Sequence, residues 1–430
     1  MSDQPARHLE TESVDAFRLR ARAWLADHMP RRALDAPPPD RAEDEQTWVR
    51  DRELQHVLWD GGFAGICFPE EYGGLGLTIE HQHAFTEESL PYEMPLHLNV
   101  PNFSILGATL VDYGSHEQKA RYLPPLLQGK HQWVQFLSEP TGGSDLAGCV
   151  TRADRDGDEW VLNGSKIWST AAMSATHAMC LARTDWDAPK HRGLTMFLME
   201  IHQPGVQVDP IKQVNGSLEF CQEFFDDVRL PPDSVVGDVN DGWTVALALL
   251  GHERNAVGGG SPYVSGRNYL AEGADGARDL SSIALVRSRG IDGDAVARQL
   301  VAEAHVLDVA QRGLVQRVTV GMGNGKLAGQ AAAITKLFTA TSAERKTEIR
   351  LALAGTDAVT WPAGEETLGR EAGESFLERQ ATSLAGGSNE IQRNIIAERV
   401  LGMPREWAAD RDVPFRDVRR NAMPTAPSGA

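Results

Sequence analysis

The sequence has no apolar run long enough to span a bilayer, and its first residues lack the apolar core of a signal peptide. Cysteine is also scarce, and its four residues form no CxxC pair. Such scattered cysteines indicate neither a zinc site nor a disulfide framework, so we expect buried free thiols. Together these absences predict a cytoplasmic protein. The cysteines are Cys67, Cys149, Cys180 and Cys221.

Positive charge is in short supply as well. The chain has 42 Lys and Arg against 60 Asp and Glu, a formal net charge of −18. This balance argues against nonspecific binding to nucleic acid or to anionic membranes, so we expect neither partner. An anionic ligand must therefore be met by local cations, and Arg254, Arg298 and Arg393 are the ones near motifs. The histidines show no HExxH or paired spacing, so no metal is expected.

The 430 residues change character twice along the chain. Helical spacing up to about residue 133 gives way to alternating patterns with hairpin-turn signals at Asp156-Gly157 and Asn163-Gly164, and helical spacing returns from Asp241. This order predicts an α+β fold in which two helical regions flank an antiparallel β-domain. The predicted divisions are 1–133, N-terminal helical domain; 134–240, middle β-domain; 241–408, C-terminal helical domain; and 409–430, a loosely ordered tail.

Two short segments carry the strongest chemical signal. In FLSEPTGGSD (Phe136–Asp145) a strand runs into a Pro-Thr-Gly-Gly-Ser turn, whose bare N–H groups and hydroxyl suit a phosphate or a polar ring edge. In NGSKIWST (Asn163–Thr170) a strand ends on one large ring and two hydroxyls, Trp168, Ser169 and Thr170. An aromatic plane beside hydrogen-bond donors suits a conjugated ring system. Taken alone, segments of these two kinds are more often an ordinary turn and a core tryptophan.

Together, the two segments resemble the flavin-binding segments of the acyl-CoA dehydrogenase family. The resemblance implies a small β-barrel between helical bundles, with bound FAD. EPTGGSDLAG, NGSKIWST and AGGSNEIQRNIIAERVLG look like actinobacterial members, some of which act on steroid side-chain thioesters. Four further stretches, in the family's order, carry the resemblance over most of the chain: PEEYGGLGL (Pro69–Leu77), YGSHEQKARYLPPLLQG (Tyr113–Gly129), FFDDVRLPPDSVVGDVNDGW (Phe224–Trp243) and GGSNEIQRNIIAERVLGMPRE (Gly386–Glu406).

The resemblance also assigns roles to individual residues. The backbone of Leu137 and the Ser138 hydroxyl are expected at the flavin pyrimidine edge, and Trp168 beside the flavin ring. Thr170 is expected near flavin N5, the hydride acceptor. Gly143 and Ser144 are expected on the ADP or pantetheine side, and Ser388 and Glu390 near the adenosine half. Ser169 is a further expected cofactor contact, and Arg254 is expected to face the acyl-CoA.

Dehydrogenation between Cα and Cβ needs a base for the α-proton. Many family members carry it as a glutamate before the C-terminal glycine, but Gly386 occupies that position here. Gly386 N–H is still expected to bond the thioester oxygen, and the missing side chain leaves room for a bulky or branched acyl chain. Isovaleryl-type and long-chain-type members instead carry the base in a Glu-Arg pair on another helix, and LALLGHERNAV places Glu253 and Arg254 there.

The local pattern agrees with Glu253 as the base. Asp241 is a plausible N-cap for a helix whose apolar stripe includes Glu253. A carboxylate in an apolar stripe should have a raised pKa, as a base for a weak carbon acid needs. The alternative is an ion pair between Glu253 and a neighbour at the helix end. The other stripe positions are Ala246, Leu249, Leu250 and Val257.

One family feature is missing. Many members have an Arg-x-x-Phe-Gly segment that reaches the FAD of a neighbouring subunit, and the glycine-rich, irregular region 258–298 does not contain it. Arg298 and Gln299 in VARQLVAEA are the replacement that we assign.

These features predict an FAD-dependent acyl-CoA dehydrogenase that passes electrons to an electron-transfer flavoprotein. A homodimer or homotetramer is expected, with a heterotetramer as the alternative assembly. Two other functions stay open: a noncatalytic partner subunit of a hetero-oligomeric dehydrogenase, which Gly386 favours, and a flavin oxidase or monooxygenase on the same fold.

Overall fold

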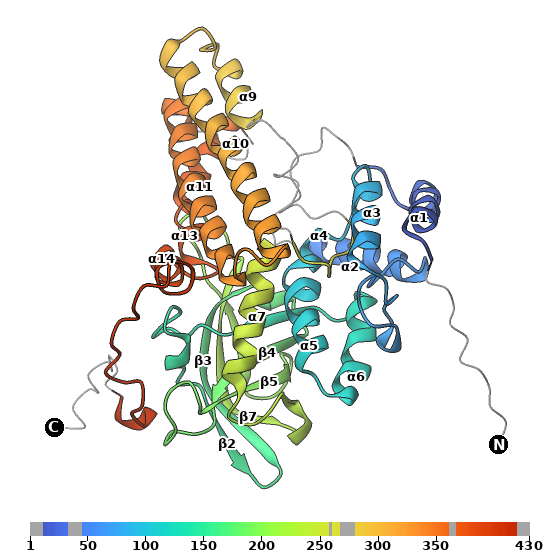
Figure 1. The fold of residues 1–430 in the computed structure, drawn as a ribbon, viewed down its shortest axis with the longest axis vertical. Helices are drawn as coiled ribbons and strands as arrows, with labels where there is room; N and C mark the ends of the chain where they lie inside the picture. Colours follow the sequence, from blue (N-terminus) through green and yellow to red (C-terminus); the bar gives the residue numbers. More distant parts are fainter. Residues whose placement is uncertain (1–11, 33–44, 258–259, 267–279, 361–366, 419–430) are drawn as a thin grey trace.

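The helix–sheet–helix order predicted from the sequence is present in the computed structural model (Figure 1), which describes residues 12–32, 45–257, 260–266, 280–360 and 367–418. The N-terminal helices pack around their own buried core and against one face of the sheet. They are α1 (Val14–His28), α2 (Glu45–Asp60), α3 (Ile79–Ser89), α4 (Leu96–Leu98), α5 (Ala108–Tyr113) and α6 (His116–Leu127), with a π-helical turn over Asn99–Gly107 between α4 and α5.

The middle region is a single sheet of eight strands in the order β6-β7-β3-β2-β4-β5-β8, with β1 also beside β4. Its end strands β6 and β8 do not pair, so the expected closed barrel is wrong and the sheet is open. It is also mixed, because β1 and β2 both run parallel to β4. The strands are β1 (Trp133–Phe136), β2 (Arg152–Asp156), β3 (Glu159–Thr170), β4 (His177–Arg183), β5 (Leu194–Glu200), β6 (Val206–Pro210), β7 (Phe220–Leu230) and β8 (Val235–Val236).

Strands β1 and β2 occupy successive lengths of the same edge of β4. Strand β1 lies beside the start of β4, and β2 meets β4 only at its last residue, through Arg152 and Arg183. Between the two strands the chain leaves the sheet, over residues 137–151. The segment that carries the Pro-Thr-Gly-Gly-Ser turn is therefore an excursion from a continuous sheet edge.

The turn signal at Asn163-Gly164 is wrong, because both residues lie inside β3. The pairing of β3 with β7 skips a position between Leu162 and Gly164, as at a β-bulge. Gly164 has φ +146°, and a Cβ there would lie 2.8 Å from the Thr151 Cα. Here glycine permits a close approach of two backbones rather than a reversal of the chain.

The C-terminal helices include a long antiparallel pair, α10 and α11, that extends away from the sheet (Figure 1). Part of the region read as irregular forms α9. No helix within the described residues is long and apolar enough to cross a membrane. The helices are α7 (Gly242–Val257), α9 (Leu280–Ser288), α10 (Ala295–Gly323), α11 (Ala332–Ala354), α12 (Leu368–Glu378), α13 (Ala381–Leu384) and α14 (Asn389–Ile395).

Helix α7 is seated in the core that joins the sheet to the N-terminal helices. Its Ala246 and Leu249 are fully buried together with Met179 and Leu181, which point from alternate positions of β4. Gly242 lets the helix start directly against β5, since a Cβ there would lie 2.6 Å from β5 backbone atoms. The position of α7 relative to the sheet is therefore set by packing at its first turns.

The tail is not loosely ordered in the part that the structure describes, which corrects that expectation. Phe415 is only 1% exposed, and the Arg183 guanidinium lies over its ring, 3.5 Å from the centroid. Lys190 joins Asp410 of the tail (2.8 Å) to Asp145 after the glycine turn (3.1 Å). An aromatic anchor and an ion-pair bridge therefore hold the tail against the β-domain, which the Pro- and Arg-rich composition did not indicate.

Candidate active site

The two segments singled out in the sequence lie side by side. Ile167 N–H donates to the Ser138 carbonyl at 3.0 Å, and the Lys166 ammonium donates to the Leu137 carbonyl at 2.9 Å. About 30 residues of chain separate these partners, which meet because β1 and β3 adjoin at the excursion. The expected pyrimidine-edge residues and the expected ring-flanking residues therefore belong to one surface.

The turn after β1 is tight and open on one side. Glu139 and Gly142 exchange backbone hydrogen bonds of 3.2 and 2.9 Å, which leaves Pro140 and Thr141 at the tip. A Cβ on Gly142 would meet no atom within 4 Å, so that side of the turn is clear. Gly143, whose Cβ position lies 3.3 Å from the Ser138 hydroxyl, continues the open side, and the neighbouring Ser144 is exposed.

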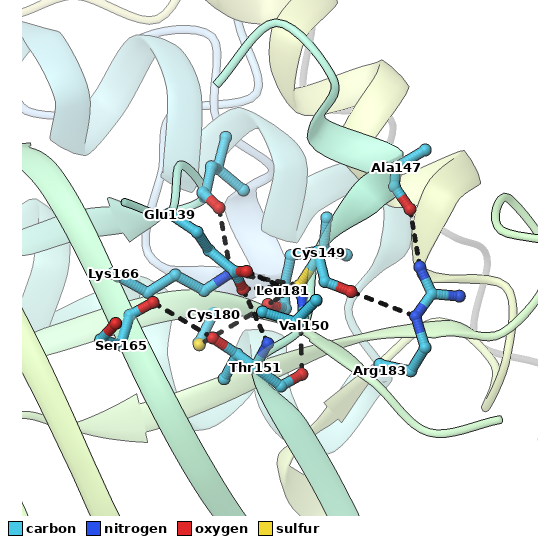
Figure 2. A network of polar contacts seen from close by, with 11 residues as sticks. Glu139, Ala147, Cys149, Val150, Thr151, Ser165, Lys166, Cys180, Leu181 and Arg183 are labelled. Atoms are coloured by element: carbon cyan, nitrogen blue, oxygen red, sulfur yellow. Dashed lines mark hydrogen bonds and ion pairs between the residues drawn. The ribbon is translucent and has the colours of Figure 1, made fainter. Parts of the chain in front are cut away.

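A buried ion pair anchors Glu139, the residue at which the turn begins (Figure 2). The Glu139 carboxylate accepts from the Lys166 ammonium at 3.0 Å and from the backbone N–H groups of Val150 (2.7 Å) and Thr151 (2.8 Å). The Cys149 thiol donates to it at 3.0 Å. Burial alone would raise the pKa of Glu139, but Lys166 and these donors lower it to about 2. This carboxylate is permanently ionised and serves as a structural support.

Trp168 is presented by a strained backbone. The pairing of β3 with β7 skips a position at Trp168, whose φ is +68°, in the left-handed region that non-glycine residues rarely adopt. The indole is 55% exposed and meets Phe220 edge-to-face at 6.0 Å. The bulge thus turns a large flat ring outward beside the open turn.

The two hydroxyls after Trp168 point differently. Thr170 is partly exposed, as a ligand contact requires. Ser169 is buried, and its hydroxyl donates to the Glu223 carboxylate at 3.0 Å. Burial raises the pKa of Glu223 to about 7, although the Ser169 hydrogen bond and Lys166 oppose the shift. The Ser169 side chain therefore faces the interior of the sheet and not the surface that Trp168 occupies.

Glu253 lies near the C-terminal end of α7 and reaches β1. Its Oε2 accepts a hydrogen bond from Gln135 Nε2 at 3.1 Å. Among the described residues, Glu253 forms no ion pair, so the helix-end alternative finds no partner there. Burial raises the pKa of Glu253, opposed by the Gln135 hydrogen bond and by the charges of Arg254 and Lys336. The carboxylate is thus enclosed, lightly bonded and more basic than usual.

Gly386 faces the same carboxylate. A Cβ on Gly386 would lie 3.3 Å from Glu253 Oε1 and 3.5 Å from Cε of Lys336. The two base positions expected from the resemblance, 253 and 386, therefore lie next to each other. Arg254 is partly buried next to Glu253, and burial lowers its pKa.

The loop that carries Gly386 is held locally. Gln392 Nε2 donates to the carbonyls of Gly386 and Gly387, at 3.1 Å each. The Ser388 hydroxyl caps α14 by accepting from Ile391 N–H at 3.4 Å. Glu390 is exposed and pairs with Arg393 at 3.3 Å on the next turn. Ser388 and Glu390, expected near the adenosine half, thus have local partners that any helix start could supply.

Arg298 and Gln299 are far from Glu253 in the same chain. They lie in the first turn of α10, next to the connection where Arg289 donates to Leu353 in the last turn of α11. Lys336, which faces Glu253, is near the start of α11. A separation of 17 helical residues corresponds to about 25 Å. The structure therefore does not bring this pair to the surface formed by the other predicted residues.

Four further residues of the candidate site were not singled out in the sequence: Gln135, Lys336, Gln392 and Glu139. Gln392 lies in the C-terminal glycine segment, but nothing in its type marked it, and Gln135 and Lys336 stand in an ordinary strand and helix. Only Glu139, next to the Pro-Thr-Gly-Gly turn and paired with Lys166 in an alternating strand, had a sequence signal that could have been used.

The surface around Trp168 fits FAD. The exposed indole offers a flat apolar face, and the turn offers room at Gly142 and the Ser138 hydroxyl beside Gly143. The indole face suits a flat ring system, and the open turn with its hydroxyl suits polar or phosphate groups.

Comparison with known proteins places family models over nearly the whole described chain. The acyl-CoA dehydrogenase N-terminal domain matches residues 11–130, the middle domain 135–228 and the C-terminal domain 240–401. Acyl-CoA dehydrogenase IpdE1 of Mycobacterium tuberculosis is 36% identical over 401 residues, covering 92% of this chain and 99% of that protein. Cyclohexane-1-carbonyl-CoA dehydrogenase of Syntrophus aciditrophicus is 26% identical, covering 85% and 93%.

A solved structure described as the Tcur3481-Tcur3483 steroid ACAD superposes with a TM-score of 0.70 at 27% identity. The match covers 93% of this chain and 100% of that one.

Proposed function

This chain belongs to the acyl-CoA dehydrogenase family, and on that premise we propose that it oxidises an acyl-CoA thioester between Cα and Cβ with Glu253 as the base. Family members are FAD-dependent oxidoreductases of lipid metabolism, and this chain is one of them. The observation that carries the choice of base is the position of Glu253 Oε1, 3.3 Å from where Gly386 would carry a Cβ.

The remaining residues supply binding and orientation. Leu137, Ser138, Gly143, Ser144, Trp168 and Thr170 hold FAD, which when bound accepts a hydride equivalent from the β-carbon. Glu253 removes the α-proton, for which its raised pKa suits it. Gly386 N–H donates to the thioester oxygen, where negative charge develops as the proton leaves. Arg254 faces the acyl-CoA.

The acyl chain that we propose is bulky or branched. Gly386 contributes no side chain beside the base, and two relatives at 26–27% identity are named for a cyclohexane-carbonyl thioester and for steroids. Electrons leave to an electron-transfer flavoprotein. We also propose that the domains divide at residues 133, 240 and 408, and that Arg298 and Gln299 serve the FAD of a neighbouring subunit, which requires at least a dimer.

The test is Glu253→Gln, which keeps the shape of the side chain but removes the basic oxygen. Anaerobic flavin bleaching by straight-chain, branched and cyclic acyl-CoA thioesters should slow about 10²–10⁴-fold. FAD content should stay unchanged, because the cofactor residues lie on the excursion and on β3. Glu53→Gln, at an exposed position on α2, is the control and should bleach at the wild-type rate.

Two outcomes would contradict the proposal. Wild-type bleaching by Glu253→Gln would remove Glu253 from the role of base. A wild-type protein that holds FAD but is bleached by none of the thioesters would instead favour a noncatalytic partner subunit.

A further inference from the structure

The base is held by a residue from the sheet. Glu253 stands on α7, but its one hydrogen bond to a described side chain comes from Gln135 of β1, at 3.1 Å. Strand β1 is the strand that runs directly into the flavin segment. One short strand therefore touches both the base and the residues expected at the cofactor.

Strand β1 is a rigid support for this contact. It pairs with β4 over its whole length, and Trp133 N–H donates to Asn102 Oδ1 at 2.6 Å. Within this pairing Gln135 lies opposite Met179 of β4. Because the backbone of Gln135 is fixed in this way, its amide defines a position for the Glu253 carboxylate relative to the surface around Trp168.

The amide of Gln135 can match both protonation states of the base. Its Nε2 donates to the carboxylate, the state that must accept a proton. Its Oε1 is buried and accepts no hydrogen bond from any residue that the structure describes. Rotation of the amide by 180° would offer Oε1 to the protonated carboxyl, which has become a donor. A cation at this place could not do so, because it would favour only the carboxylate.

Two cations also face Glu253. Arg254 is the next residue on α7, and Lys336 approaches from α11. Lys336 Nζ donates to the Thr382 carbonyl at 2.5 Å, and the hydrogen bonds of the described residues include none from Lys336 or Arg254 to Glu253. Both act on Glu253 through their field, so they do not determine its orientation.

We propose that Gln135 is the positioning residue for the base: its amide aims the Glu253 carboxylate from β1 and stays bonded to it as the proton arrives. The proposal rests on the proposed function, since it needs Glu253 to be the base. It adds a residue on a different element and assigns the orientation of the base to the sheet.

The experiment compares Gln135→Met, which keeps length but has no donor, with Gln135→Glu, which adds a like charge. The control is Gln207→Met on the exposed strand β6, where Gln207 also donates to a carboxylate, Asp209, at 2.9 Å. The rate of anaerobic flavin bleaching is measured against pH for each variant. FAD content and thermal midpoint are measured in parallel.

Gln135→Met should lower the limiting rate about tenfold, because the base is no longer aimed. The acid limb of its pH–rate profile should move to higher pH by about one unit, because the Glu253 carboxylate has lost a hydrogen-bond donor. Gln135→Glu should move the limb further in the same direction, and Gln207→Met should leave the profile unchanged. The infrared carbonyl band of protonated Glu253, identified by its loss in Glu253→Gln, should persist to higher pH in Gln135→Met.

Failure of this inference is distinct from failure of the proposed function. If Glu253→Gln is inactive while Gln135→Met keeps the wild-type rate and acid limb, Gln135 does not position the base. A loss of rate in Gln135→Met without a shift of the acid limb or of the infrared band would also overturn the inference, because a merely structural defect would produce that result. If Glu253→Gln bleaches normally, the assignment of the base fails first.

Discussion

Two glutamates stand beside lysines, the buried Glu139 and the partly buried Glu253, and their pKa values shift in opposite directions. Glu139 in the β-domain accepts from Lys166, Cys149 and two backbone N–H groups, and its pKa falls to about 2. Among the described residues, Glu253 on α7 accepts a hydrogen bond from Gln135 alone, with Lys336 acting at a distance, and its pKa rises. Burial acts in the same direction on both, so the number of donors decides which carboxylate supports the fold and which remains basic.

Glu223 is a further buried glutamate, on β7. It has one donor, the Ser169 hydroxyl at 3.0 Å, and its Oε1 is buried without a partner among the described residues. Its pKa is about 7. Glu223 and Glu253 each accept one hydrogen bond from a described side chain and have a raised pKa, whereas Glu139, with four donors, has a lowered one.

The largest expected difference in stability is between variants of the two lysines, Lys166 and Lys336. Lys166→Met should destabilise the protein by about 3–5 kcal/mol, because it leaves the Glu139 charge buried without its counter-ion. Lys336→Met should cost less than about 1 kcal/mol, since Lys336 makes no direct ion pair with Glu253 in the described structure. Chemical unfolding of both variants measures the contrast, and equal losses would show that direct bonding is not what distinguishes the two sites.

Glu223→Gln should change how stability depends on pH. A carboxyl whose pKa rises from 4.5 to about 7 on folding favours the native state below pH 4.5, and that contribution is lost as the pH rises through 7. The variant should therefore match the wild type near pH 4.5 and exceed it at pH 8 by about 1–3 kcal/mol. Thermal midpoints across this range provide the measurement. A wild-type advantage at pH 8 would mean that Glu223 is ionised and well solvated or paired.

The last comparison concerns Gly386→Ala and a second glycine with positive φ. Gly386 has φ +63°, and Gly325, between α10 and α11, has φ +72° with no atom within 4 Å of its Cβ position. Alanine at either position should cost about 1–2 kcal/mol of unfolding free energy through backbone strain. Only Gly386→Ala should also slow flavin bleaching, because its new Cβ would crowd Glu253 Oε1 at 3.3 Å. Equal bleaching rates in the two variants would separate Gly386 from the base.

The sequence motifs led to a correct fold class, cofactor and family, because each depends on local features that survive in one dimension. The glycine turn and the Trp168 strand are short contiguous segments, and the helix of Glu253 has a clear apolar stripe. The closed barrel was wrong because strand patterns do not report whether β6 and β8 meet. The Asn163-Gly164 turn was wrong because glycine serves equally for a reversal and for a close backbone approach.

By itself, the sequence determined the order of the regions, the presence of a flavin surface and the absence of a glutamate at 386. Only the tertiary structure decided that Glu253 lies beside Gly386, that Gln135 is its donor and that Glu139 is fully bonded. These are contacts between residues 10–133 positions apart. They depend on how α7, β1 and the excursion over residues 137–151 pack together. The type of a residue does not reveal how many hydrogen-bond donors packing will bring to it.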